Sequence, residues 1–352
     1  MGGASASHRG EGGNGLASPD LERGIVPHLE DAFGRRFRYL RLSVTDACGF
    51  RCAYCLPDGY RPSADAPSPL SVAEVRRLVG AFAALGVEKV RLTGGEPTAR
   101  GDLLELVAAV AATPGIRAVA LTTNGQGLAR LARPLRQAGL TAVNVSVDSL
   151  DERRFEQVTG RPLLPRVLAG VDAALAEGFA AVKVNAVLLR GLEEPELDRF
   201  LEWTRRSPLS VRFIELMRTG CNRNFHEANH RPVDWLEGLL AARGFRPVPR
   251  GPADGPAVEY RHPEHAGRVG IIAPTSAHFC EGCNRLRVSS RGALRLCLFG
   301  DAEVPLRPLL GSDELALSLR ARLAELVGEK PRAHRLAEGR SGLAWTLAGI
   351  GG

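Results

Sequence analysis

The chain of 352 residues lacks any apolar run close to the roughly 20 residues that a membrane-spanning helix needs. Its first 24 residues, MGGASASHRGEGGNGLASPDLERG, also lack the apolar stretch of a secretory signal. They contain acidic residues, which are rare in transit peptides. We therefore expect no membrane partner, a cytoplasmic location, and a disordered tail over residues 1–24.

Lysine is scarce. The three lysines are Lys89, Lys183 and Lys330, against 43 arginines, and the formal net charge is +7. Composition bias accounts for most of these arginines, although a guanidinium is also a fixed, bidentate donor for phosphate. Because there is no long basic run, the sequence does not predict a nucleic-acid partner.

Cysteines are few but clustered. Cys48, Cys52 and Cys55 follow the first predicted strand with the spacing C-x3-C-x2-C. A [4Fe–4S] cluster normally takes four thiolates, so three would leave one iron open to a small molecule. A structural zinc site prefers four ligands in pairs, and a disulfide framework suits short secreted chains with an even number of cysteines. The trio therefore predicts a radical enzyme rather than an electron carrier, and it fits neither a zinc site nor a disulfide framework.

A second trio, Cys280, Cys283 and Cys297, has the spacing C-x2-C-x13-C. Two incomplete sets favour a second cluster with an open iron, and Cys221 is then left unliganded. The C-x2-C pair is also a common zinc signal. A zinc knuckle therefore remains an alternative, completed by one of His262, His265, His278 or Cys221.

Strand-like and helix-like segments alternate along the first part of the chain. The predicted strands are Arg38–Val44, Lys89–Thr93, Ala118–Thr122, Ala142–Val147, Ala181–Val187 and Val211–Ile214. The predicted helices are Ser71–Leu85, Asp102–Ala112, Leu128–Ala138, Leu164–Glu177 and Pro195–Arg206. This alternation predicts an α/β fold with parallel strands, a partial (βα)6 TIM-type barrel that is open on one side. An open doubly wound sheet is the alternative.

Polar residues recur on one face of these strands. Successive side chains of a strand point to opposite faces. One face carries Arg41, Ser43, Thr45, Arg91, Thr93, Thr122, Asn124, Asn144, Ser146, Asp148, Lys183 and Asn185. The other face is apolar and should meet the helices. Because a polar interior needs hydrogen-bond partners, a large polar ligand is expected inside the barrel.

The composition changes near Gly220, where Gly, Pro and Arg become common, as in Arg246–Pro256. Short strands are predicted at Val269–Ile272 and Leu286–Val288, and a final helix at Asp313–Val327. We divide the chain into the tail 1–24, the barrel 25–219 and a C-terminal region 220–352. That region is expected to carry the second cluster and to close the open side of the barrel.

Gly94, Gly95, Glu96 and Pro97 follow a strand directly, at the barrel end where such folds bind ligands. Two glycines there would let the backbone approach a ligand. The cysteine trio with Tyr54 before its last member, followed by GGEP, resembles the radical S-adenosylmethionine superfamily. The further segments LTGGEPTAR, LTTNG, NVSVDSLD, VKVNAV, RFIELM and FCEGCNRLRVSSRGALRLCLFG occur in order, with a terminal Gly-Gly. Together they resemble the GTP 3′,8-cyclases of molybdenum cofactor biosynthesis, the MoaA family, from about residue 25 onward.

The resemblance implies a lyase with two [4Fe–4S] clusters, held by Cys48, Cys52 and Cys55 and by Cys280, Cys283 and Cys297. It places Tyr54, Gly95, Ser146 and Met217 at S-adenosylmethionine. The GTP contacts that it implies are Arg41, Arg91, Thr122, Lys183, Arg285, Leu286 and Arg287, with Arg212 near the triphosphate. The terminal Gly351 and Gly352 would enter the active site.

The implied reaction cleaves S-adenosylmethionine to a 5′-deoxyadenosyl radical, which removes the ribose 3′ hydrogen of GTP so that this carbon attacks C8 of the purine. The product, 3′,8-cyclo-7,8-dihydro-GTP, would pass to a cyclic pyranopterin monophosphate synthase. A flavodoxin- or ferredoxin-type electron donor and a homodimer are also implied. Two alternatives stay open: a peptide-modifying radical enzyme with an auxiliary cluster, and a zinc-bearing RNA-binding module without enzymatic activity.

Overall fold

The computed structural model describes residues 28–63, 66–249, 251, 255–276, 280–300, 302–334 and 348–349. The tail 1–24, His278, Gly351 and Gly352 lie outside these ranges. Within them, no helix combines the length and apolar character required to cross a membrane.

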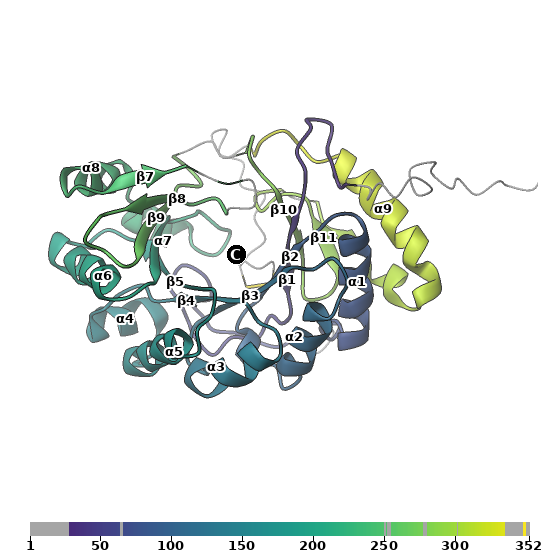
Figure 1. The fold of residues 1–352 in the computed structure, drawn as a ribbon, viewed down its shortest axis with the longest axis horizontal. Helices are drawn as coiled ribbons and strands as arrows, with labels where there is room; N and C mark the ends of the chain where they lie inside the picture. The colour runs from purple at the N-terminus through teal and green to yellow at the C-terminus, as the bar shows by residue number, and fades with distance from the viewer. Residues whose placement is uncertain are drawn as a thin grey trace, which may run out of the picture.

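Six parallel strands with intervening helices form the first part of the fold, as the sequence predicts. The strands are β1 (Tyr39–Ser43), β2 (Lys89–Thr93), β3 (Ala118–Thr123), β4 (Ala142–Ser146), β5 (Ala181–Leu188) and β6 (Ser210–Glu215). The helices are α1 (Val72–Ala84), α2 (Leu103–Ala111), α3 (Leu128–Gln137), α4 (Glu152–Thr159), α5 (Leu164–Ala176) and α6 (Glu194–Arg206), with a 3-10 turn η1 (Pro97–Ala99). Figure 1 shows the strands in an arc with these helices outside it.

Local sequence signals mark several helix ends. A capping box starts α1, since the Ser71 side chain accepts from the Glu74 amide and the Glu74 carboxylate accepts from the Ser71 amide. Asp151 caps α4, and Gly160 ends it with φ of 67°. The sequence analysis did not predict α4, because its eight residues carry few apolar side chains.

The C-terminal region contributes strands to both edges of this sheet. Its elements are α7 (Arg223–Asn229), α8 (Asp234–Ala242), β7 (Arg246–Val248), β8 (Val258–Arg261), β9 (Arg268–Ile272), β10 (Arg285–Val288), β11 (Ala293–Arg295), β12 (Val304–Pro305), η2 (Arg307–Leu310), η3 (Asp313–Leu315) and α9 (Ala316–Gly328). The predicted final helix thus begins as a 3-10 turn and becomes α-helical only from Ala316.

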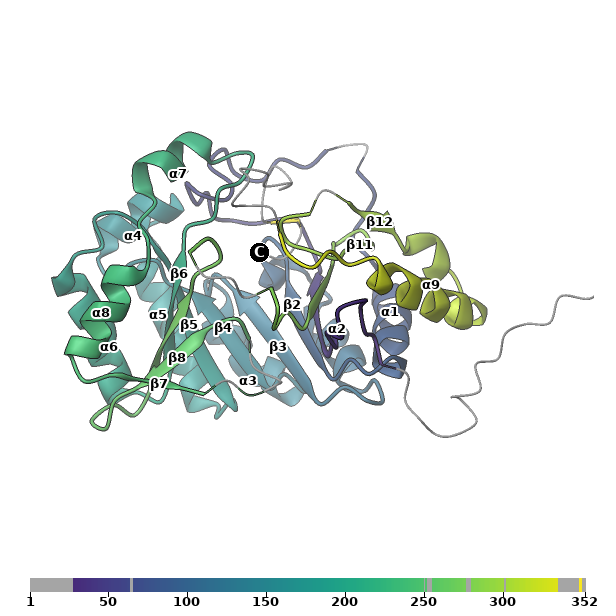
Figure 2. The ribbon, with the colours of Figure 1, turned by 90° about the horizontal axis from the view of Figure 1, so that it is seen from above.

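The strand order is β12-β11-β10-β1-β2-β3-β4-β5-β6-β9-β8-β7. Strand β10 pairs in parallel with β1, and β9 in parallel with β6, so the parallel run extends past both ends of the predicted six strands. The described sheet stays open, as expected for a partial barrel. The C-terminal region therefore flanks both edges of the sheet rather than only covering its open side, and α9 packs on α1 (Figure 2).

The predicted alternation of faces is confirmed. Leu42, Val90, Leu92 and Val145 belong to the apolar core between sheet and helices. Arg41, Arg91, Asn144 and Lys183 instead line a cavity on the concave side.

Candidate active site

Two adjoining cavities occupy the concave side of the sheet, and Asn185, Ile214 and Met217 line both. We call the first the cysteine-loop cavity; its lining includes Cys48, Cys52, Tyr54, Cys55, Gly95, Thr122, Ser146 and Asp148. We call the second the basic chamber; its lining includes Tyr39, Arg41, Lys89, Arg91, Lys183, Arg212, Cys280, Cys283, Arg285, Arg287, Cys297 and Lys330. The two predicted cysteine trios thus face neighbouring cavities.

The loop that carries the first trio is fastened to α4. The amide of Arg51 donates to Thr159 O at 2.9 Å, and the amide of Ala53 donates to Val158 O at 2.9 Å. The Phe50 ring packs edge-on against Phe155 of α4. The helix that the sequence analysis missed therefore fixes the position of the cysteines.

The thiols of the first trio are close enough to affect one another. Burial raises the pKa of Cys48, and it raises the pKa of Cys52 well above its usual value, with Asp148, Cys55 and Cys48 adding to the effect on Cys52. Burial therefore favours the neutral thiols, whereas bound iron deprotonates a thiol outright. The donor set thus fits an iron–sulfur cluster.

Within the described ranges, no three His, Cys, Asp or Glu side chains converge closely enough to hold a single metal ion. In a cubane each thiolate binds a different iron, so the thiolates stay further apart than around one ion. His262 and His265, considered above as zinc ligands, instead pack against Phe245 and line a different cavity.

The two glycines after β2 serve close backbone packing. Gly94 has φ of +142°, and a Cβ there would lie 2.2 Å from Thr45 O. A Cβ on Gly95 would lie 2.4 Å from Ala47 O, and the Gly95 amide donates to Thr45 O at 2.7 Å. The sequence analysis expected these glycines to let the backbone approach a ligand. In the structure both glycines line the cysteine-loop cavity, and they also let the β2 loop approach the cysteine loop, since a side chain at either position would collide with it.

Glu96 links the loop after β2 to the end of β3. Its fully buried carboxylate accepts from the Thr98 amide at 2.9 Å, the Thr123 hydroxyl at 2.7 Å and the Asn124 amide at 2.6 Å. Burial raises its pKa despite these donors. The sequence analysis gave this residue no role of its own; an acidic residue between Gly-Gly and Pro is its only signal.

Tyr54 is held by a second buried carboxylate. Its hydroxyl donates to Asp148 Oδ2 at 2.7 Å, while Asp148 Oδ1 accepts from the Val187 amide at 2.9 Å. The Tyr54 carbonyl accepts from Asn222 Nδ2 at 3.0 Å. Burial, and then the Asp148 charge, raise the pKa of Tyr54 well above its usual value. The predicted S-adenosylmethionine residues Tyr54, Gly95, Ser146 and Met217 all line this cavity.

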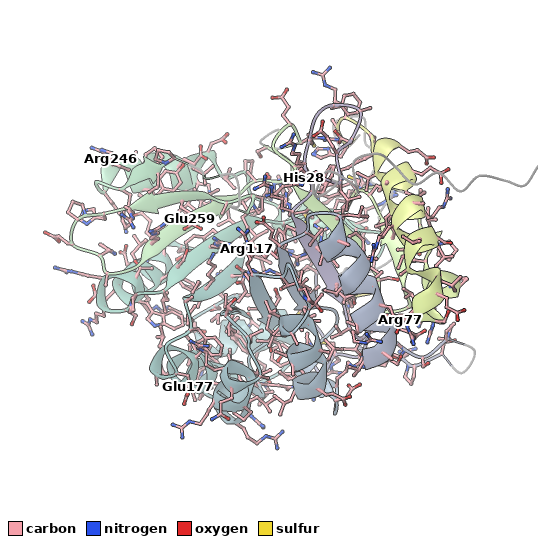
Figure 3. All side chains as sticks on the ribbon, turned by 45° about the vertical axis from the view of Figure 1, so that its right-hand side comes forward. His28, Arg77, Arg117, Glu177, Arg246 and Glu259 are labelled. Carbon is pink, nitrogen blue, oxygen red and sulfur yellow. The ribbon has the colours of Figure 1, made fainter. Side chains whose placement is uncertain are left out.

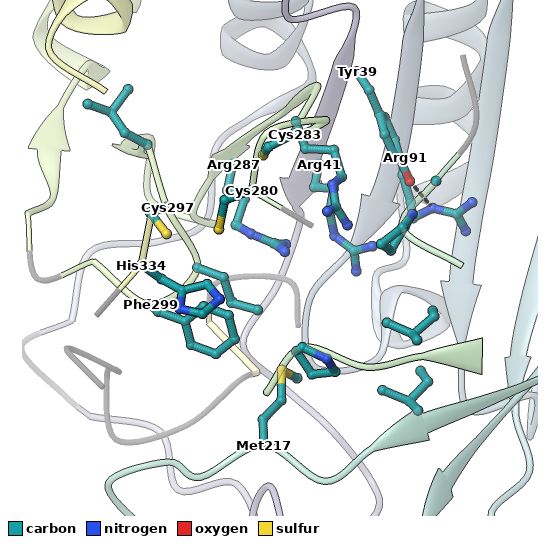
Figure 4. A pocket seen from close by; sticks show the side chains of 18 of the residues that line it. Tyr39, Arg41, Arg91, Met217, Cys280, Cys283, Arg287, Cys297, Phe299 and His334 are labelled. Carbon is teal, nitrogen blue, oxygen red and sulfur yellow. Dashed lines mark hydrogen bonds between the residues drawn. The ribbon is translucent and has the colours of Figure 1, made fainter. Parts of the chain in front are cut away.

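The arginines of the basic chamber come together through strand register. Arg41 of β1 lies between Arg287 of β10 and Arg91 of β2, as neighbours across parallel pairs. One level below, Tyr39 lies between Arg285 and Lys89 in the same way. In Figure 4, the guanidinium groups of Arg41 and Arg287 point into the space between the second cysteine trio and Tyr39.

Burial among like charges destabilises the charged forms of these side chains. It lowers the pKa of Arg41 to about 10 and that of Arg287 well below its usual value, with neighbouring guanidinium groups adding to both shifts. Burial, and then Arg212, lower the pKa of Lys183 to about 7. Burial would raise the pKa of Tyr39, but Arg91, Arg41 and Lys89 outweigh it and bring that pKa down to about 7. The chamber is thus built to receive a polyanion.

The second cysteine trio borders this positive potential. Burial opposes ionisation of Cys283, but Lys330, Arg285 and Arg287 outweigh it and lower its pKa. Arg35 donates to Cys280 O at 2.9 Å, and the Lys330 ammonium donates to the carbonyl of Leu296, beside Cys297. Burial raises the pKa of Cys280, so the cations favour the thiolate at Cys283 in particular; a thiol with nearby cations fits a metal–sulfur group.

Other predicted residues take distinct places. Thr122 accepts from Arg91 Nη1 at 3.2 Å and lines the cysteine-loop cavity. The Leu286 side chain is fully buried in the apolar core, which leaves only its backbone for a ligand. Cys221 donates its thiol proton to Cys55 O at 3.3 Å. Gly351 and Gly352 lie outside the described residues.

Several lining residues were missed by the sequence analysis, namely Tyr39, Lys89, Arg35 and Lys330. Tyr39 and Lys89 share the strand face of Arg41 and Arg91, so extending the alternation by two residues would have found them. Nothing local marks Arg35 or Lys330, which reach the chamber through the tertiary fold.

Comparisons with known proteins cover nearly the whole chain and agree with one another. Residues 42–204 match the model of the Radical SAM superfamily, and residues 209–336 match that of Molybdenum Cofactor Synthesis C. A GTP 3′,8-cyclase of Stenotrophomonas maltophilia is 54% identical over 327 residues, covering 93% of this chain and 100% of that protein. One of Aeromonas hydrophila is 52% identical, covering 95% and 99%.

Solved structures share the fold at low identity. Streptococcus suis SuiB bound to S-adenosylmethionine superposes with a TM-score of 0.59 at 14% identity, covering 83% of this chain and 68% of that one. The anSMEcpe structure with bound AdoMet and a peptide has a TM-score of 0.50 at 12% identity, covering 82% and 83%. At such identities the likeness concerns the fold alone.

Proposed function

Since the chain belongs to the GTP 3′,8-cyclase family of the radical SAM superfamily, we propose that it converts GTP to (8S)-3′,8-cyclo-7,8-dihydroguanosine 5′-triphosphate in molybdenum cofactor biosynthesis. The observation that carries this proposal is that two cavities, each lined by a cysteine trio, adjoin one another, and that the basic chamber is strongly cationic. We also propose that the enzyme is a lyase.

Cys48, Cys52 and Cys55 would hold a [4Fe–4S] cluster, whose chemistry is the one-electron cleavage of bound S-adenosylmethionine. Tyr54, Gly95, Ser146 and Met217 would bind that molecule in the cysteine-loop cavity. Asp148 orients Tyr54 by accepting a hydrogen bond from the Tyr54 hydroxyl. The Glu96 carboxylate keeps the surrounding loops in place without entering the cavity.

Cys280, Cys283 and Cys297 would hold a second [4Fe–4S] cluster, near which the guanine base binds. Arg285 and Arg287 would then contact the nucleotide beside that group, with the Leu286 backbone between them. Arg41, Arg91, Lys183 and Arg212 would bind the triphosphate. Thr122 accepts a hydrogen bond from Arg91 and so orients it. The reacting ribose would lie where the two cavities meet, beside Asn185 and Met217.

Other parts of the proposal concern partners and domains. We keep the division into 1–24, 25–219 and 220–352, with Gly351 and Gly352 entering the site as bare backbone. A flavodoxin- or ferredoxin-type donor, a downstream cyclic pyranopterin monophosphate synthase, a homodimer and a cytoplasmic location complete it. The curated relatives described above give no support to the alternative of a peptide-modifying enzyme.

The test is an anaerobic incubation of the reduced, cluster-loaded protein with S-adenosylmethionine and GTP. We expect 5′-deoxyadenosine and, after acid oxidation, a fluorescent pterin in matching amounts. Release of 5′-deoxyadenosine only with a peptide, or without any pterin from GTP, would contradict the proposed function.

A further inference from the structure

The basic chamber adjoins a third cavity of about 820 Å³, and Lys183, Arg212 and Gly255 line both. We call it the lower cavity. It lies around the first residues of β5, β6 and β9 and is lined by Arg246, Arg261 and Arg268, besides Arg212 and Lys183. Among its described lining residues, Glu259 is the one carboxylate.

Arg212 stands at the junction of these two cavities. Its side chain is 10% exposed, and its Nη2 donates to Glu259 Oε1. The other carboxylate oxygen of Glu259 accepts from the Ser210 hydroxyl at 2.9 Å. The Nε of Arg212, by contrast, is buried and has no hydrogen-bond partner among the described residues. This guanidinium therefore retains a donor for a further acceptor.

Gly270 lies directly between the two partners of this ion pair. Arg212 of β6 and Glu259 of β8 are both register neighbours of Gly270 on β9, the strand between them. A Cβ at Gly270 would lie 3.0 Å from Arg212 Cγ and 3.3 Å from Glu259 Oε1. A side chain at this position would crowd both residues, so the glycine leaves them room to meet across β9 (Figure 3 labels Glu259).

A carboxylate at this place competes with a phosphate for the same guanidinium. Burial dominates the low pKa of Lys183, and Glu259 acts against it, so this carboxylate also reaches the neighbouring cation electrostatically. A nucleotide tail that extends to Arg212 must share or displace Glu259, whereas a shorter tail leaves the pair intact.

We propose that Glu259 is a positioning residue, the resident counter-ion of Arg212, which the outer phosphates of a nucleoside triphosphate displace from the junction of the basic chamber and the lower cavity. In the empty site Glu259 holds Arg212 in place, and it takes the guanidinium back when the nucleotide leaves. Glu259 thereby sets how strongly the site distinguishes nucleotides by the length of their phosphate chain. This inference rests on the proposed function, which places a nucleotide in the chamber.

The test compares Glu259→Gln with Glu264→Gln in the reconstituted, cluster-loaded protein. Glu264 is a matched control, because it forms an exposed ion pair with Arg205 and does not line the lower cavity. The dissociation constants of GTP and GMP are measured by anaerobic calorimetry. Glutamine keeps the shape and an acceptor oxygen but removes the charge that the phosphates must displace.

We expect Glu259→Gln to tighten GTP binding by about fivefold or more while GMP binding stays nearly constant, and Glu264→Gln to change neither. Ser210→Ala, which frees one carboxylate oxygen of Glu259, should shift the GTP/GMP ratio in the same direction by a smaller factor. The inference would be overturned if the GTP/GMP affinity ratio were unchanged in Glu259→Gln and Ser210→Ala. Weaker GTP binding by Glu259→Gln would overturn it as well. A wild-type protein that binds neither nucleotide would overturn the proposed function as well.

Discussion

Arg41 of β1 and Arg287 of β10 are direct neighbours across a parallel strand pair, although they come from the two ends of the chain. Both guanidinium groups turn into the basic chamber, and Arg287 is 8% exposed. Burying two like charges side by side costs free energy unless an anion joins them. The edge pairing of β10 with β1 therefore creates a site that a polyphosphate would stabilise.

This relationship predicts the effect of Arg287→Ala. The variant should keep its iron but lose at least about thirtyfold in kcat/KM for GTP, because a buried charged donor to the nucleotide is removed. Arg322→Ala is the control, since Arg322 pairs with Glu325 on the exposed face of α9. The anaerobic pterin assay, with iron analysis of each preparation, measures the change. Unchanged turnover would remove Arg287 from the site.

The two cysteine trios predict how iron is divided. Cys52→Ser and Cys283→Ser should each lose about half of the iron and sulfide bound by the wild type, since each variant disables one of two equal [4Fe–4S] clusters. Cys221→Ser should keep the full content, because that thiol belongs to neither trio and hydrogen-bonds to the Cys55 carbonyl and the Thr219 hydroxyl. Colorimetric iron and sulfide analysis after anaerobic reconstitution distinguishes these cases. A Cys283→Ser variant with full iron, or one that releases zinc, would refute the second cluster.

The low pKa of Lys183 predicts proton uptake on GTP binding. With a pKa of about 7, Lys183 is largely neutral at pH 8 in the empty chamber, and an adjacent triphosphate raises that pKa so that the amine binds a proton. Tyr39, with a pKa also near 7, should take up a proton in the same direction. Calorimetry in buffers of different ionisation enthalpy should show uptake at pH 8 and little at pH 6. Lys183→Arg and Tyr39→Phe should each reduce the proton uptake at pH 8. Equal uptake at both pH values would contradict the low pKa of these two groups.

The backbone contact at Gly94 predicts a strong effect of a single methyl group. Gly94→Ala should lower the free energy of unfolding by about 3 kcal/mol or more and reduce iron binding at the first trio, since its Cβ collides with Thr45 O at a positive φ. Gly101→Ala is the matched control, because a Cβ there meets nothing within 4 Å. Denaturant unfolding and iron analysis report the two effects. Equal stability of the two variants would show that the loops can separate without cost.

The terminal glycines predict a separation of assembly from turnover. A chain that lacks Gly351 and Gly352 should bind both clusters and S-adenosylmethionine but fail to form the pterin. Side chains at these positions, as in Gly351→Ala with Gly352→Ala, should have a similar effect, because only bare backbone would fit. Full turnover by the shortened chain would refute the role of the tail.

The sequence by itself determined the local part of this protein. Strand alternation placed Arg41, Arg91 and Lys183 on one face, and cysteine spacing defined both trios, since these signals depend only on neighbouring residues. The extension of the sheet by β9 and β10, the support of the cysteine loop by α4, and the placement of Lys330 and Glu259 were decided by the tertiary structure. Each of these depends on contacts between distant segments, and no local periodicity encodes such contacts. The pairing of Arg212 with Glu259 across Gly270 is the clearest case, because it requires three strands in register.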